Sequence, residues 1–105
     1  METVRQELWR GLVELRRLPG SGLPAGSIGA FTTIVTWASN PAEFRDKAEC
    51  LAASLKLYVF GVEGEHPVAN DPPGAVNGIA GLIERAEGNP NAILYGTFYT
   101  YRVEH

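Results

Sequence analysis

Two carboxylates and an imidazole lie within four residues of one another, at Glu63, Glu65 and His66. These groups serve as metal ligands and as general acids or bases, so their spacing is compatible with a small enzyme. Alternation along a strand would place Glu63 and Glu65 on one side and His66 on the other, unless Gly64 and Pro67 permit a bend. We favour a simpler interpretation, an acidic strand end that leads into a loop and can serve as a negatively charged docking surface.

Cys50 is the single cysteine, which excludes an intrachain disulfide and agrees with a reducing compartment. It lies off the apolar face of its predicted helix, and Lys47 is the one nearby cation that could activate its thiol. We interpret it as an incidental, partly exposed cysteine. The sequence shows no metal cluster, phosphate loop or nucleophile constellation, so we expect no catalytic residue, no metal site and no cofactor.

A strand, a helix and a second strand follow one another in the middle of the chain. Residues 31–37 are dense in β-branched and aromatic side chains, which favour a strand. Asn40 and Glu43 have capping-box spacing at the start of a helix over 42–56. Residues 57–62 predict the next strand. Because such crossovers are right-handed, we expect the two strands to be parallel, and either adjacent or one strand apart.

The segment before this unit is compatible with two structures. Most apolar residues of 3–18 gather on one face at 100° per residue, which predicts an amphipathic helix. The alternative is a strand, broken by Gly11, that pairs with the strand over 31–37 across a long loop. That loop, 18–29, holds four glycines and two prolines. It leads into a strand and lacks Lys and Arg, so we do not interpret it as a phosphate-binding loop.

The last third of the chain predicts a helix and a long strand. Residues 75–87 carry an apolar stripe, but Gly78 and Gly81 lower its helix propensity. This helix therefore depends on packing, or its glycines let another backbone come close. Residues 92–103 alternate as one strand. Large amphipathic side chains on an exposed sheet face are candidate interface anchors, and one face of this strand carries Tyr95, Tyr99 and Tyr101.

Length and composition indicate one globular domain over 1–105. The chain is 45% hydrophobic and 20% charged, which is typical of a domain that buries a core. A net charge of -3 argues against nucleic acid and favours a basic protein partner. No apolar run approaches the roughly 18 residues that cross a bilayer, and the charged first residues are unlike a secretory signal. We expect a cytoplasmic protein, and we base no function on Val103–His105, which resemble the start of an expression tag.

The order of predicted elements, helix, strand, helix, strand, helix and strand, indicates an α/β (α+β) fold. We expect a two-layer sandwich, in which a small mixed sheet has helices packed on one face. One sheet face would then be at least partly solvated.

Three stretches resemble the pattern of small cytosolic immunity proteins from bacterial polymorphic-toxin and contact-dependent growth inhibition systems. They are 37–44, the strand end Val62–Glu63 and 95–101, and the likeness covers most of the chain after Phe31. It implies a compact, often acidic protein without catalytic residues. Such proteins neutralise a cognate toxin, frequently a basic nuclease, by stoichiometric binding at or beside its active site.

The expected function is therefore that of an immunity-type toxin inhibitor. Acidic side chains would steer the basic toxin and tyrosines would anchor it. The candidate partner-binding residues are Glu63, Glu65, Asp71, Tyr95, Tyr99 and Tyr101. Two alternatives remain open: a dimeric small-molecule-binding domain, with ligand between the sheet and the glycine-rich loop, and a small enzyme that uses His66 and Glu63. A homo-oligomer is compatible with each.

Overall fold

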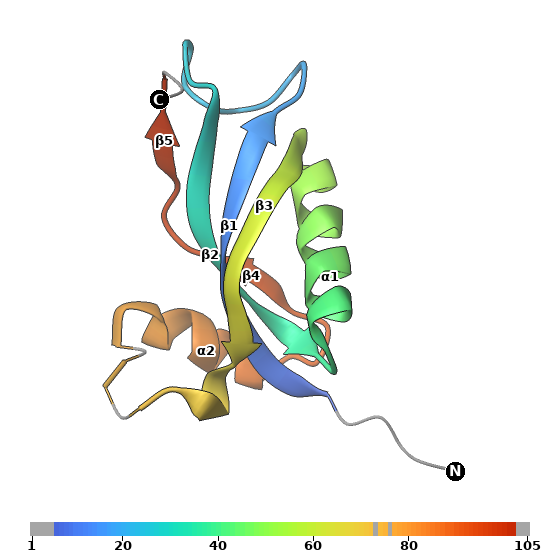
Figure 1. Cartoon of the computed structure of the whole chain (residues 1–105), viewed down its shortest axis with the longest axis vertical. Coiled ribbons are helices and arrows are strands. Elements are labelled where there is room, and N and C mark those ends of the chain that lie inside the picture. Colours follow the sequence, from blue (N-terminus) through green and yellow to red (C-terminus); the bar gives the residue numbers. More distant parts are fainter. Residues whose placement is uncertain (1–5, 73, 76, 103–105) are drawn as a thin grey trace.

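A computed structural model describes residues 6–72, 74–75 and 77–102, which form a five-stranded sheet with two α-helices (Figure 1). Parts of the predictions above that concern 3–5, 76 and 103–105 lie outside these residues. The elements are β1 (Glu7–Arg17), β2 (Gly29–Ala38), α1 (Pro41–Ser54), β3 (Leu57–Pro67), the 3-10 turns η1 (Val68–Asn70) and η2 (Asn77–Ile79), α2 (Ala80–Glu87), β4 (Ile93–Tyr95) and β5 (Tyr99–Tyr101).

The sheet confirms the predicted α+β class and differs from it in one respect. Its strand order is β3-β1-β2-β4, with β5 also paired to β2. All strand pairs in the described part of the chain are antiparallel, so the sheet is not mixed. Because β2 and β3 are both antiparallel to β1, they run parallel to each other with β1 between them. This arrangement confirms the predicted crossover with one intervening strand.

The helix predicted over 3–18 is wrong. The alternative strand is correct, but Gly11 does not break it. This segment forms β1, which pairs with β2 on one side and β3 on the other. Trp9, Val13 and Leu15 alternate inward to the cluster beneath α1, whereas Leu8 packs into a second cluster on the opposite face. Apolar side chains on both faces of a central strand obscure the two-residue period, which explains the mistaken prediction.

The predicted cap starts α1, and this helix covers one face of the sheet. The Oδ1 atom of Asn40 accepts a hydrogen bond from the Glu43 amide at 2.8 Å. The Glu43 carboxylate in turn accepts from the amide of Ser39 at 3.0 Å, one residue before the capping residue. Phe44 and Ala48 are fully buried against β1 and β2. The capping interactions and the burial confirm the predicted strand-helix-strand unit.

The second helix lies on the opposite face of the sheet. Leu82 and Ala86 of α2 pack with Val35, whose neighbour Ile34 points into the α1 cluster. The indole Nε1 of Trp37 donates to the Ala86 carbonyl at 2.8 Å. The two helices therefore do not share one face as expected. Because α2 has only eight residues, it covers one end of its face and leaves the rest uncovered (Figure 1).

The predicted final strand is interrupted. β4 and β5 pair with different parts of β2, and residues 96–98 between them belong to neither strand. The ring of Tyr95 stacks on Phe98 at 5.1 Å between centroids, and Phe98 packs against the α1 cluster. Tyr95 pairs with Ile34 and shares its face, whereas Tyr99 pairs with Phe31 on the opposite face. The three tyrosines therefore do not lie on one face.

Candidate functional site

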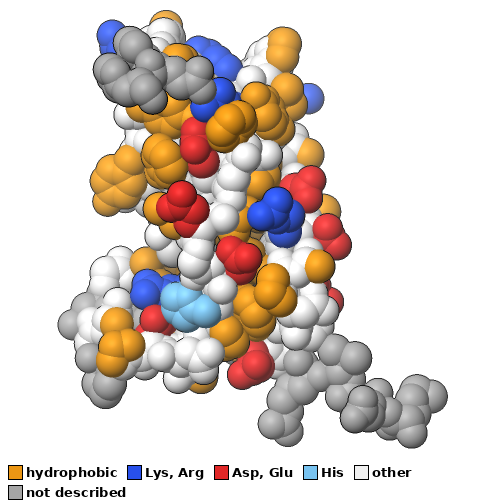
Figure 2. Space-filling view, viewed as in Figure 1, with side chains coloured by type: hydrophobic (Ala, Val, Ile, Leu, Met, Phe, Trp, Pro, Cys, Tyr) orange, Lys and Arg blue, Asp and Glu red, His pale blue; other side chains and the backbone are white. Residues whose placement is uncertain are grey.

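The part of the sheet that neither helix covers is called the open face below. Residues directly opposite in neighbouring strands share a face, so the pairs of Leu12 with Glu63 and of Glu14 with Phe31 define it. Tyr99 is 68% exposed and Phe60 is 53% exposed. Figure 2 shows hydrophobic side chains on the side of the sheet away from α1, interspersed with acidic and basic ones. The open face consists of Leu12, Glu14, Arg16, Phe31, Thr33, Tyr58, Phe60, Glu63, Tyr99 and Tyr101.

Polar contacts hold several aromatic rings of the open face in place. The Arg16 guanidinium lies 3.5 Å from the centroid of the Phe60 ring and 3.4 Å from the Glu14 carboxylate. The Tyr101 hydroxyl donates to the same carboxylate, and its ring lies 5.6 Å from that of Phe31. Burial raises the pKa of Tyr101, and the bond to Glu14 raises it further. These contacts hold the rings of Phe31, Phe60 and Tyr101 in place, and side chains that are already ordered lose less entropy when a surface becomes buried.

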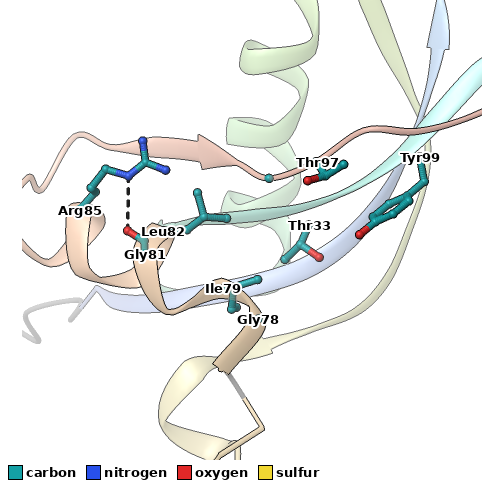
Figure 3. Close-up of a pocket in the computed structure, with 9 residues that line it drawn as sticks. Thr33, Gly78, Ile79, Gly81, Leu82, Arg85, Thr97 and Tyr99 are labelled. Atoms are coloured by element: carbon teal, nitrogen blue, oxygen red, sulfur yellow. Dashed lines mark hydrogen bonds between the residues drawn. The ribbon is translucent and has the colours of Figure 1, made fainter.

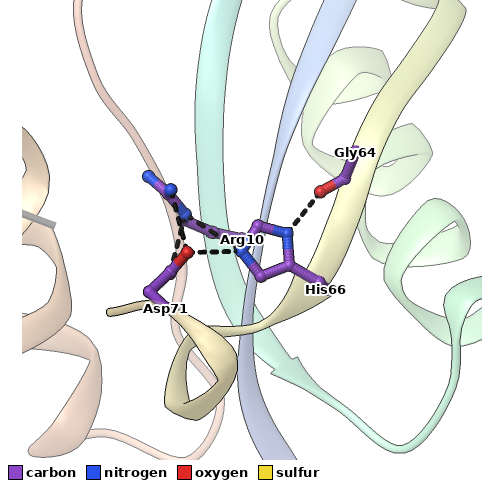
Figure 4. A network of polar contacts seen from close by, with 4 residues as sticks. All are labelled: Arg10, Gly64, His66 and Asp71. Atoms are coloured by element: carbon purple, nitrogen blue, oxygen red, sulfur yellow. Dashed lines mark hydrogen bonds and ion pairs between the residues drawn. The ribbon is translucent and has the colours of Figure 1, made fainter. Parts of the chain in front are cut away.

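A network of Arg10, His66 and Asp71 borders the open face beside η1 (Figure 4). The imidazole Nε2 lies 2.8 Å from Oδ1 of Asp71, and the Arg10 guanidinium lies 3.0 Å from Oδ2. The Nδ1 atom of His66 lies 2.5 Å from the Gly64 carbonyl oxygen. Since a carbonyl only accepts, Nδ1 carries the proton in that bond.

The network favours a charged imidazolium. The hydrogen bond to Asp71 raises the pKa of His66, and the bond to the Gly64 carbonyl adds to this effect. Burial by itself would raise the pKa of Asp71, but hydrogen bonds from His66 and Arg10 outweigh it and lower that pKa. Both ring nitrogens of His66 are thus engaged, and neither is available as a general base. The geometry supports a structural role for this network, which ties the segment after β3 to β1.

A turn in β3 explains why His66 and Glu63 share a face. Gly64 adopts a φ of 64°, and the β1–β3 register shifts between Arg10 and Leu12. This bulge places Glu63 opposite Leu12 on the open face and His66 opposite Arg10 on the same side. The predicted bend is therefore present, but it separates the two glutamates.

The structure divides the six predicted partner-binding residues. Glu63, Tyr99 and Tyr101 lie on the open face. Glu65 instead lies beside Gly11 and Phe44 on the α1 side. The Asp71 side chain is only 9% exposed within its network and offers no carboxylate for docking. Tyr95 lies on the α1 side. The acidic residues thus do not converge.

Sequence reasoning missed the aromatic residues that β3 adds to the open face. Tyr58 and Phe60 are exposed, whereas Leu57 is buried and Val59 packs against the α1 cluster. This alternation of large aromatic and aliphatic residues is visible in the sequence and could have identified them. Arg10 could not have been found in this way, because its partners come from a distant segment.

Three of the surface cavities lie beside the residues discussed above or the glycine-rich loop. One of about 160 Å³ is bordered by Arg10, Glu63 and His66, and a larger one of about 270 Å³ lies between α2 and the sheet (Figure 3). Thr33 lines both, so they adjoin on one face. The third holds about 140 Å³ and lies between the glycine-rich loop and the α1 layer. The alternative of a small-molecule-binding domain predicted a ligand between the sheet and this loop. The lining of this cavity is apolar: Gly22, Leu23, Leu55, Leu57 and Phe98.

Other chemical features are few in the part of the chain that the structure describes. No three His, Cys, Asp or Glu side chains there form a group suited to a metal ion. Cys50 is exposed on α1, as expected. None of the helices in the described ranges is long and apolar enough to cross a membrane. Comparison of the chain with protein-family models, curated proteins and solved structures finds no match.

Proposed function

We propose that this protein is an immunity-type inhibitor that binds a cognate bacterial toxin through the open face of its sheet. The observation that carries this proposal is the cluster of exposed rings on a face that neither helix covers, with Tyr99 at 68% and Phe60 at 53% exposure. Aromatic residues dominate the energetics of protein interfaces, because they bury a large area and order few torsions.

The arrangement of charges also suits a protein partner. Arg16 and Glu14 neutralise each other, so neither would be desolvated as an isolated charge when the neighbouring rings are covered. Glu63 lies exposed at the margin of the open face. A charge at this position would act mainly on the rate of association with a basic toxin.

The enzyme alternative has less support. His66 uses both ring nitrogens in bonds to Gly64 and Asp71, and Asp71 is shielded from solvent. A general base needs a free nitrogen within hydrogen-bond reach of a substrate proton. Stoichiometric binding requires no such group.

The proposal is tested by co-purification with the product of the gene directly upstream, followed by calorimetry. We expect a one-to-one complex of nanomolar affinity. Tyr99→Ser and Phe60→Ser should each weaken it by about 30-fold or more, since central aromatic anchors contribute about 2 kcal/mol or more. Tyr95→Ser removes a similar ring from the other face and should leave the affinity unchanged. Equal losses for all three variants, or no complex, would overturn the proposal.

A further inference from the structure

We propose that the cavity between α2 and the sheet binds a small polar molecule that carries a carboxylate or phosphate group. This site goes beyond the proposed function and does not depend on it. The cavity holds about 270 Å³, roughly nine times the volume that one water occupies in the liquid. Its wall is formed by Thr33, Gly78, Ile79, Gly81, Leu82, Arg85, Gly96, Thr97 and Tyr99.

Arg85 supplies the positive charge of this cavity. It is the one charged residue in the wall, and its Nε donates to the Gly81 carbonyl at 3.3 Å within α2. Among the described residues no carboxylate lies within ion-pair distance of its guanidinium. The Nε bond holds the guanidinium plane, and its two terminal nitrogens keep their donors. A planar pair of donors of this kind matches the two oxygens of a carboxylate or phosphate.

Three hydroxyl groups stand across the cavity from Arg85. They belong to Thr33 of β2, to Thr97 between β4 and β5, and to Tyr99 of β5. Figure 3 shows the Tyr99 hydroxyl turned toward Thr33, with the Leu82 side chain between these groups and Arg85. Hydroxyls both donate and accept, so this end suits the polar body of a ligand.

Two glycines line the cavity at α2 and the turn before it. A Cβ atom at Gly78 or Gly81 would meet nothing within 4 Å, and neither residue has a positive φ. The idea that these glycines admit another backbone is therefore not supported, and neither backbone strain nor packing accounts for them. Gly81 lies inside α2, where glycine lowers helix propensity. Both glycines line the cavity, and a Cβ atom at either position would meet open space.

The test is a titration of the intact protein with inorganic phosphate and, separately, with succinate, followed by amide chemical shifts in NMR. We expect saturable shifts, confined to the residues of the cavity wall, with at least one probe. Arg85→Gln should weaken this binding at least tenfold. Arg45→Gln makes the same change in net charge on the exposed side of α1 and should have no effect. Glycerol, which has hydroxyls but no charge, should produce no saturable shift.

A second variant tests the cavity itself. Gly81→Leu fills the space with a side chain that favours helix, so the fold should persist while binding is lost. Shifts that persist in Arg85→Gln or Gly81→Leu would overturn the proposal. Shifts that fail to saturate with both probes would also overturn it. These outcomes are distinguished from the toxin test by Phe60, which does not line the cavity, whereas Tyr99 belongs to both the cavity wall and the open face.

Discussion

The Nε2 atom of His66 lies 2.8 Å from Oδ1 of Asp71, which is five positions further along the chain. This contact closes the segment through η1 onto the end of β3. Arg10, from β1, completes the closure through its own contact with the carboxylate at 3.0 Å. Three elements therefore meet at the Asp71 carboxylate. Whether His66 is protonated decides how many hydrogen-bond donors this carboxylate accepts from.

Stability should decrease as the pH rises through the raised pKa of His66. The charged imidazole donates to Asp71, and this contribution is complete below the ordinary His pKa of 6.5. Above the folded-state pKa, Nε2 loses its proton and turns a lone pair toward the carboxylate. Urea unfolding between pH 5 and 9 measures the effect. His66→Gln should flatten the dependence across this range, and a variant that retains the full dependence would contradict the assignment.

At acid pH, the contribution of Asp71 to folding stability changes with pH in the opposite direction to that of His66. Its pKa is lowered from 3.8, so its contribution is present above that value and is lost as the pH falls through the lower folded-state pKa. The network is therefore most stabilising between about pH 4 and 6.5.

The two glutamates of β3 provide a matched test of steering. Glu63 lies on the open face, whereas Glu65 lies beside Gly11 on the α1 side. If the proposed toxin binds the open face, Glu63→Lys should slow association with a basic toxin several-fold and reduce the salt dependence of the rate, because it reverses a charge at the margin of the proposed interface. Glu65→Lys makes the same change on the opposite face and should have a smaller effect. Stopped-flow mixing at two ionic strengths separates them, and equal effects would remove the open face from the interface.

Two strand glycines should respond differently to alanine. A Cβ at Gly29 would overlap the Leu15 carbonyl oxygen and lie 2.8 Å from the Tyr101 hydroxyl. Gly29→Ala should therefore destabilise the protein by about 1–3 kcal/mol, because backbone atoms must shift. A Cβ at Gly61 meets nothing within 4 Å, so Gly61→Ala should change stability by less than about 0.5 kcal/mol. Urea unfolding measures both, and similar values would show that the space at Gly29 is not limiting.

The centre of the fold was predictable because its signals are local. Asn40 and Glu43 are three residues apart, and their capping contact needs nothing from the rest of the chain. The β-branched residues around Ile34 and Val35 are of the types that are enriched in strands. Local chemistry and tertiary packing agree in these elements, so their sequence was sufficient.

The remaining differences come from contacts between distant segments. β1 is a strand because β2 and β3 pair with both of its sides, and nothing within its own sequence shows this. Tyr95 leaves the face of Tyr99 because Phe98 packs toward the α1 cluster and breaks the alternation. Asp71 is withdrawn from the surface by Arg10, which lies sixty-one residues away. For reasons of this kind, three of the six predicted partner-binding residues lie away from the open face: Glu65, Asp71 and Tyr95.

β3 forms one edge of the sheet, and β1 is its only partner among the described strands. A long edge strand exposes a row of amide and carbonyl groups that can recruit a strand from another molecule. Two register shifts interrupt this row, and charged side chains at Glu63 and Glu65 lie along it. The bulge that assigns the glutamates to opposite faces thus also places an irregularity in this edge strand, and bulges of this kind disfavour edge-to-edge pairing with another chain.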